Sequence, residues 1–271
     1  MNTSHDPWFA RVIEGLKDLP GVEAIALGGS RGAGTSDAGS DYDLYVYVRE
    51  MVDPSRREAI LAPLCSYLEV NNQFWETEDD GILRSGIPVD VVYRSLDWLT
   101  EHLESLLGAG QAATGYTTCF WYNLLNSRVL YDPRGGYAAL QEKWRIAYPR
   151  KLQENILSKN LPLLRGKLPS YLGQVEKAVG RNDWVSVHHR VTALMESVFD
   201  ILFALGEMPH PGEKRQVQFL LDAGTPVPEN FEDQVENIME NTGPAGAAVL
   251  PGLLNTLIDG VYSLAGWIEH E

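Results

Sequence analysis

Two aspartates one residue apart open an apolar strand in this sequence, directly after a loop rich in glycine and serine. The segment is GGSRGAGTSDAGSDYDLYVYV, residues 28–48, and the two acids are Asp41 and Asp43. Residues i and i+2 of a strand point to the same face, so the two carboxylates project together. Holding two anions this close is unfavourable unless a divalent cation joins them, and carboxylate oxygens suit Mg²⁺ or Mn²⁺.

A third acid lies in a similar setting further along the chain. Asp90 stands in the middle of the apolar run IPVDVVY, residues 87–93. Charged side chains are rarely buried without a partner. If this run pairs beside the first strand, its carboxylate joins the other two. Three carboxylates can hold two cations about 3.5–4 Å apart, the arrangement used for in-line displacement at phosphorus.

The loop before the aspartates supplies groups that suit a phosphate. Gly28 and Gly29 let backbone amides approach an anion closely. Ser30 adds a hydroxyl donor, and Arg31 can offset phosphate charge. The loop has neither the Gly-Lys-Ser/Thr of a P-loop nor the G-x-G-x-x-G spacing. An acidic pair after glycine and serine is often only a solvated turn, so it is the combination with a later strand aspartate that indicates a site.

Strands and helices alternate around these residues. Periodicity and capping signals predict helices over residues 7–18, 54–64 and 96–107, and strands over residues 22–27, 43–48, 70–75, 82–84 and 88–93. This interleaving favours a mixed α+β domain.

The second half of the chain has a different pattern. The strand signal fades after residues 131–133, and Pro and Gly then punctuate helical segments. The predicted helices cover residues 137–165, 171–180, 184–205, 213–222, 231–240 and 246–269. We therefore expect an α+β domain over residues 1–132 followed by an all-α helical bundle over residues 133–271.

Composition narrows the class of protein. The 271 residues are 44% hydrophobic and 22% charged, with two cysteines. No apolar run approaches the ~20 residues that span a bilayer, and residues 1–19 do not read as a secretory signal. These features favour a cytoplasmic protein. The net charge of −15 disfavours nucleic acid as a partner. It is either a solubility feature or an attraction for a cationic substrate.

The spacing of these motifs resembles the nucleotidyltransferase superfamily that includes DNA polymerase β and the aminoglycoside and lincosamide nucleotidyltransferases. The matching residues are Gly29-Ser30, Asp41-x-Asp43 and Asp90, within residues 22–94. The resemblance implies a small mixed sheet backed by helices. It implies catalytic and metal-binding roles for the three aspartates. It also implies a nucleotide-binding set, which comprises Gly29, Ser30, Arg31, Ser40 and Lys214.

The helical half resembles the acceptor-side domain of the antibiotic-modifying members. The segment that carries this resemblance runs from Arg181 to Val217. By the resemblance, Glu196 is a catalytic residue, the general base for the acceptor hydroxyl, and Asp183 caps the helix that carries it. Lys214 is assigned to the triphosphate or the departing pyrophosphate. A solvent-facing glutamate and a surface lysine are the plainer alternatives, and Asp90 is the alternative base.

The activity implied is transfer of a nucleoside monophosphate, AMP from ATP or the equivalent from another nucleoside triphosphate, with release of pyrophosphate. The implied cofactor is two Mg²⁺ ions, with Mn²⁺ as the alternative. The implied acceptor is a small hydroxylated, cationic molecule such as an aminoglycoside, which would make the enzyme an antibiotic-resistance protein. Because several relatives share sites across a dimer, a homodimer is also open.

Four other interpretations compete with this one. The acceptor could be an RNA end or a protein side chain, as in toxin–antitoxin members, or the chain could be a catalytically inactive nucleotide-binding module. A D-x-D glycosyltransferase would leave Asp90 unexplained. Arg181-Asn182 followed by His188 loosely matches a helical ribonuclease signature, although an exposed histidine is the simpler explanation.

Overall fold

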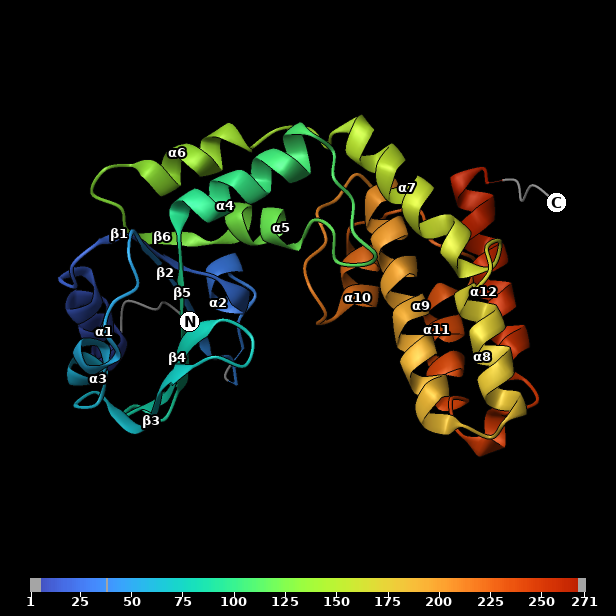
Figure 1. The fold of residues 1–271 in the computed structure, drawn as a ribbon, viewed down its shortest axis with the longest axis horizontal. Helices are drawn as coiled ribbons and strands as arrows, with labels where there is room; N and C mark the ends of the chain where they lie inside the picture. The colour runs from blue at the N-terminus through green and yellow to red at the C-terminus, as the bar shows by residue number, and fades with distance from the viewer. Residues whose placement is uncertain (1–5, 38, 268–271) are drawn as a thin grey trace. The chain divides into compact units, whose positions relative to one another are not determined.

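The computed structural model describes residues 6–37 and 39–267 (Figure 1). The chain divides into two compact units, which we treat separately. The sheet unit contains residues up to 104 together with 123–145, and the helical unit contains residues 105–122 and 146 onward. The predicted boundary between residues 132 and 133 falls inside the sheet unit, and a division into folding domains at that point stays a prediction.

The sheet unit is built on a six-stranded mixed sheet. The strands are β1 (Val22–Leu27), β2 (Tyr42–Val48), β3 (Cys65–Asn72), β4 (Thr77–Leu83), β5 (Pro88–Arg94) and β6 (Arg128–Tyr131). Their order is β3-β4-β5-β2-β1-β6. The pair β2 and β5 is parallel, and the other neighbouring pairs are antiparallel. The two strands that carry the predicted site aspartates are therefore adjacent and run in the same direction.

Helices accompany this sheet. They are α1 (Pro7–Lys17), α2 (Gly29–Ala33), α3 (Pro54–Leu61), α4 (Leu96–Leu103) and α6 (Gly136–Lys143), with α5 (Cys119–Asn126) passing from the helical unit into the sheet unit. Helices α1 and α3 contact each other and belong to one side of the sheet (Figure 1). Their buried side chains join a core with inward residues of β2 and β5, including Leu44, Val46, Val89 and Val91. The other face of these strands carries the polar residues.

The helical unit consists of helices packed around α9. It comprises α7 (Arg150–Leu164), α8 (Tyr171–Gly180), α9 (Trp184–Leu205), α10 (Gln216–Asp222), α11 (Phe231–Glu240) and α12 (Leu250–Ala265). Helix α9 contacts α7, α8, α10 and α12, and most of its apolar side chains are buried in one cluster. In the part of the chain that the structure describes, none of the helices combines the length and apolar character needed to cross a membrane.

The predicted fold class, an α+β sheet domain followed by a helical bundle, is confirmed. Some elements differ from expectation. The strand predicted over 70–75 is confirmed only over residues 70–72, since β3 begins earlier, at Cys65, and ends at Asn72. The helix predicted over 137–165 is interrupted: α6 ends at Lys143 and α7 begins only at Arg150, with Pro149 as its N-cap. Helix α12 begins at Leu250, and the end of the helix predicted over 246–269 lies outside the described residues.

Candidate active site

Three carboxylates meet where β2 and β5 begin. Asp43 on β2 is in register with Asp90 on β5, and Asp41 directly precedes β2. One oxygen from each carboxylate lies within 4.8 Å of the others, and all three side chains are half-buried. The expectation that the strand of Asp90 pairs beside the first is therefore confirmed. Hard oxygen donors at this spacing fit Mg²⁺ or Mn²⁺.

Alternation along the strands explains this arrangement. Tyr42 and Leu44 are buried in the core on the side of α1 and α3, which leaves Asp43 on the opposite face. Val89 and Val91 are buried in the same core, which leaves Asp90 on the opposite face of β5. Because the two strands are parallel and in register, burying both sets of apolar residues forces the aspartates together. The apolar sequence of the strands thus positions the polar site.

The electrostatics of Asp90 follow from its neighbours. Burial, together with the charges of Asp43, Asp80, Asp41 and Glu78, raises the pKa of this carboxyl to about 6, and burial is the largest cause. All four neighbours are carboxylates, so the site holds a concentrated negative potential. A divalent cation would relieve this repulsion and favour the ionised form of Asp90.

The glycine turn lies directly against Asp43. The amide of Gly28 donates to the backbone carbonyl of Asp43 at 2.8 Å. Gly29 has φ +55°, and a Cβ atom there would lie 1.7 Å from Oδ2 of Asp43. A side chain at this position would therefore displace the carboxylate. Gly29 also opens α2, where the sequence predicts a loop. The first amides of a helix have no partner within it, so they and the half-buried Ser30 are suited to phosphate oxygens.

Arg31 and Ser40 fold the connection between α2 and β2. Nε and Nη2 of Arg31 donate to the carbonyl of Ser40 at 3.0 and 2.6 Å. The Arg31 guanidinium also lies 4.4 Å from the centre of the Tyr42 ring. The Ser40 hydroxyl accepts from the amide of Asp37 and donates to its carboxylate. In this structure both residues therefore hold the loop that presents Asp41, and their contact with a nucleotide stays a prediction.

Sequence reasoning missed further acids near the site. Asp80 on β4 is in register with Asp90, and Glu69 on β3 is in register with Asp80. Asp80 and Glu69 form a row of carboxylates with Asp43 and Asp90, one on each of four adjacent strands. We call this row the acidic row. Directly opposed residues share a face of the sheet. The signal is weak in the sequence, because TEDDGIL reads as a solvated acidic run.

The remaining predicted site residues belong to the helical unit. Glu196 lies on α9, is half-buried, and has its pKa raised by burial. Asp183 caps this helix by accepting from the amide of Ser186 at 3.1 Å, as predicted. Lys214 is exposed and precedes α10, which begins at Gln216 rather than at the predicted residue 213. His188 is exposed on α9.

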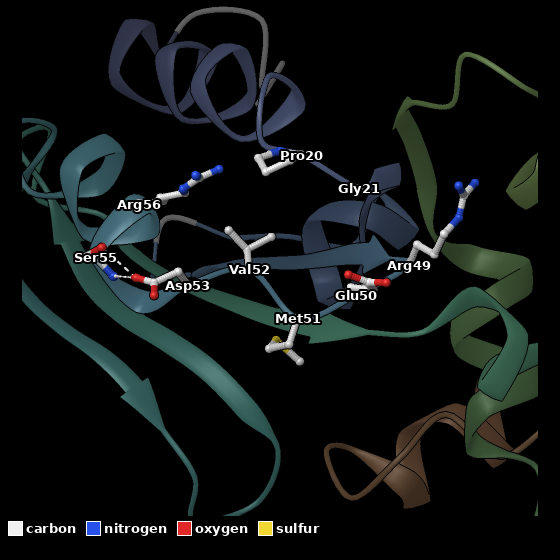
Figure 2. A pocket seen from close by; sticks show the side chains of 9 residues that line it. All are labelled: Pro20, Gly21, Arg49, Glu50, Met51, Val52, Asp53, Ser55 and Arg56. Carbon is white, nitrogen blue, oxygen red and sulfur yellow. Dashed lines mark hydrogen bonds between the residues drawn. The ribbon is translucent and has the colours of Figure 1, made fainter.

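A separate open cavity of about 570 Å³ follows the other end of β2 (Figure 2). It is lined by residues 49–53, 55 and 56 with Pro20 and Gly21. Within it, Ser55 donates its amide and hydroxyl to Asp53, the N-cap of α3. Asp41 and Asp43 lie at the start of β2, so this cavity is not part of the carboxylate site.

Sequence comparison defines the class of protein. Residues 10–112 match the family described as nucleotidyltransferase domain. This range contains the glycine turn and all three aspartates. Residues 10–112 therefore form a nucleotidyltransferase domain, as the resemblance predicts, and this domain supports a nucleotidyltransferase enzyme.

Two solved structures are similar over most of the chain. One is a nucleotidyltransferase-like protein from Exiguobacterium sibiricum, with 12% identity, a TM-score of 0.44, and coverage of 95% of this chain and 73% of that one. The other is an aminoglycoside 6-adenyltransferase from Bacillus subtilis, with 8% identity, a TM-score of 0.28, and coverage of 96% and 90%. No curated protein sequence matches the chain. Because both TM-scores are below 0.5, the fold assignment rests on the chain's own sheet and helices.

Proposed function

We propose that the chain transfers a nucleoside monophosphate, AMP from ATP in the first instance, to a hydroxyl of a small cationic acceptor such as an aminoglycoside. The observation that carries this proposal is the meeting of Asp41, Asp43 and Asp90 beside the turn at Gly28–Ser30. Phosphoryl chemistry depends on positioning and on neutralising charge, and this arrangement offers both.

The chemistry assigns a role to each group. Asp41, Asp43 and Asp90 would hold the divalent cations, which neutralise charge on the phosphates when bound. The first amides of α2 and the hydroxyl of Ser30 would orient phosphate oxygens. The acceptor oxygen forms a bond to the α-phosphorus, and the bond from that phosphorus to pyrophosphate breaks. The hydroxyl proton passes to a carboxylate, which we assign to Glu196.

The acidic row supports a cationic acceptor. Asp43, Asp90, Asp80 and Glu69 present carboxylates on four adjacent strands, beginning at the candidate metal site. Of these, Asp80 accepts a hydrogen bond from Asn72 at 2.9 Å. Carboxylates beyond those needed for the cations attract a positively charged molecule toward the same surface. The nucleoside triphosphate is a cytoplasmic metabolite, which supports a cytoplasmic location.

Release of pyrophosphate tests the proposal. The full chain is incubated with Mg²⁺, each of the four nucleoside triphosphates, and kanamycin, neomycin, streptomycin or lincomycin in turn. We expect pyrophosphate release that depends on one acceptor, with the acceptor's mass raised by one nucleoside monophosphate. Asp43→Asn is the inactive control. Nucleotide transfer to RNA or to the protein itself, with none to the antibiotics, would overturn the proposed acceptor class.

The assignment of the base has its own test. Burial raises the pKa of Glu196, which suits a group that must accept a proton near neutral pH. We expect Glu196→Gln to lower kcat by about 10²–10⁴-fold, the usual contribution of a general base. The measurement is kcat with the acceptor identified in the panel. An unchanged kcat would move the role of base to Asp90.

A further inference from the structure

A buried carboxylate in the helical unit holds a distant segment in place. Asp200 on α9 is 1% exposed. Its Oδ1 accepts from the amide of Thr117 at 2.9 Å, and its Oδ2 accepts from the hydroxyl of Thr117 at 2.6 Å. A buried carboxylate is unfavourable unless hydrogen bonds compensate it. These two bonds therefore fix Thr117 to the C-terminal half of α9.

The neighbouring residue strengthens this attachment. Thr118 is 1% exposed, and its hydroxyl accepts from the backbone amide of His210 at 2.7 Å. Two consecutive threonines thus bind two different parts of the helical unit. The segment before them has little freedom to move away from α9 while both bonds are present.

The turn before Thr117 lies on α9 at Glu196. Gly115 has φ +83°, and a Cβ atom there would lie 2.9 Å from Cβ of Glu196. Residues four apart on a helix lie on the same face, so Glu196 and Asp200 are neighbours on α9. The hydrogen bonds to Asp200 therefore hold the turn at Gly115 against α9, next to Glu196, the proposed general base.

Tyr116 lies between Gly115 and Thr117 in this turn. It has φ +53°, a conformation that bulky residues rarely adopt. Its ring is half-buried, with its centre 4.9 Å from that of the His210 ring. Burial raises the pKa of its hydroxyl, a hydrogen bond with Gln216 opposes this, and the charges of Glu196 and Glu213 raise it. The charges of Glu196 and Glu213 therefore act on the phenol.

We propose that Tyr116 contacts the acceptor molecule beside Glu196, and that Asp200 is the positioning residue that holds Tyr116 there through Thr117. Glycine or asparagine would adopt this backbone conformation more easily, so a tyrosine at φ +53° points to a use for its side chain. An aromatic face suits a cationic acceptor, and the phenol hydroxyl suits its hydroxyl groups. This inference rests on the proposed function, because it takes Glu196 to face the acceptor.

Kinetics of the full chain test the contact with the acceptor. The probe is whichever antibiotic of the panel gives the highest pyrophosphate release, with ATP varied separately. We expect Tyr116→Gly to raise the KM for that antibiotic about tenfold, the loss of a shielded cation–π contact, while the KM for ATP is unchanged. Tyr116→Phe keeps the ring and should retain most of the affinity. An unchanged acceptor KM in Tyr116→Gly, or a parallel rise in both KM values, would overturn the contact.

A matched control separates the ring from the backbone. Glu207 is exposed, follows α9, and has φ +51°, so Glu207→Gly gives the same release of backbone strain without touching the turn. Glu207→Gly should keep or raise the melting temperature, Tyr116→Gly should lower it because the half-buried ring is lost, and only Tyr116→Gly should raise the acceptor KM. If Glu207→Gly raises it equally, the effect is general loosening and the contact is rejected.

A second pair of variants tests Asp200. Thr117→Ser keeps both hydrogen bonds to Asp200, whereas Thr117→Val loses the one from the hydroxyl. Thr117→Val should raise the acceptor KM as Tyr116→Gly does and should speed amide hydrogen exchange over residues 113–118. Thr117→Ser should match the wild type in both. If no antibiotic is turned over at all, the proposed function fails, and equal exchange in the two variants would still overturn the positioning role by itself.

Discussion

Asp79 and Asp90 lie on neighbouring strands of one sheet, but on opposite faces and in opposite surroundings. Asp79 is 0% exposed, and Nη1 of Arg57, also 0% exposed, lies 3.0 Å from its Oδ1. The amide of Asn71 and the hydroxyl of Tyr93 donate to the same carboxylate at 2.8 and 2.9 Å. On this face the chain supplies its own cation and hydrogen bonds to a buried charge.

On the other face of the sheet, the carboxylates have other carboxylates as neighbours. Asp90 is in register with Asp43 on one side and Asp80 on the other, and every charge that raises its pKa belongs to an acid. The sheet unit thus provides a buried cation for Asp79 on one face. On the other face, at the start of β2 and β5, it places several carboxylates close together. The difference indicates that the second face is built to receive a cation from outside, at a cost in stability of the metal-free protein.

The largest effect is expected on the catalytic face. Asp43→Asn should lower nucleotide transfer by at least ~10³-fold, because an amide is a poor substitute for a charged oxygen donor to a divalent cation. Removing one of the repelling charges should leave the metal-free fold intact or more stable. The measurements are pyrophosphate release and urea denaturation in the presence of a chelator. Full activity in this variant would contradict the assignment of Asp43 as a metal ligand.

The opposite outcome is expected on the structural face. Arg57→Met leaves Asp79 buried without its cation, which should lower the free energy of unfolding by about 3–5 kcal/mol. The measurement is urea denaturation of the metal-free chain. Adding Asp79→Leu to the same variant removes the stranded charge and should restore much of the stability. A loss below ~1 kcal/mol in the single variant would mean that the pair contributes no more than a surface salt bridge.

The sequence predicts the catalytic face better than the structural one, for a physical reason. Asp43 and Asp90 interrupt apolar strands and Asp41 directly precedes one, so their unusual setting is visible locally. Asp79 and Arg57 look like ordinary surface charges, because each becomes buried only when α3 and β4 are packed together. The same holds for Thr117, whose partner Asp200 is 83 residues away. Tertiary hydrogen bonds of this kind leave no periodic pattern in a single sequence.

Element boundaries show the same division. The strand at 22–27 and the helix at 184–205 are predicted at their observed limits, since capping and apolar runs mark them. Helix α5 and strand β6 are not anticipated, although Asn123 on α5 donates to the hydroxyl of Tyr45 at 3.0 Å behind the glycine turn. A side chain that supports a site through a non-local contact gives no local signal.

A glycine pair separates contact with Asp43 from backbone strain. Gly29 and Gly34 both have positive φ, but a Cβ atom at Gly34 would meet nothing within 4 Å, whereas one at Gly29 would meet Asp43. Each alanine variant should lose about 1 kcal/mol of stability from its backbone conformation. Only Gly29→Ala should also lower nucleotide transfer, by roughly 10–100-fold, as expected when a ligand is displaced rather than removed. Equal activity in the two variants would show that Gly29 does not position the carboxylate.

The smallest expected effect is a pH dependence of the free energy of unfolding. It distinguishes the two faces of the sheet and is measured without the reaction. The pKa of Asp90 is about 6, above the usual 3.8, so between these values the folded chain holds more protons than the unfolded chain. The free energy of unfolding of the metal-free protein should therefore fall as the pH rises from about 4 to about 6. Asp200, with a pKa raised to about 6 by burial, contributes in the same direction.

The difference between wild type and Asp90→Asn isolates the contribution of Asp90, because Asp200 is present in both. The difference curve should rise in favour of the variant over this pH range and level off above it. Adding Mg²⁺ should stabilise the wild type increasingly as the pH rises, since the cation binds only ionised carboxylates. Urea denaturation at a series of pH values, with Mg²⁺ or a chelator, measures both. If Mg²⁺ stabilises Asp90→Asn as much as the wild type, Asp90 is not a metal ligand. Asp90 and Asp79 would then differ only in how their carboxylates are solvated.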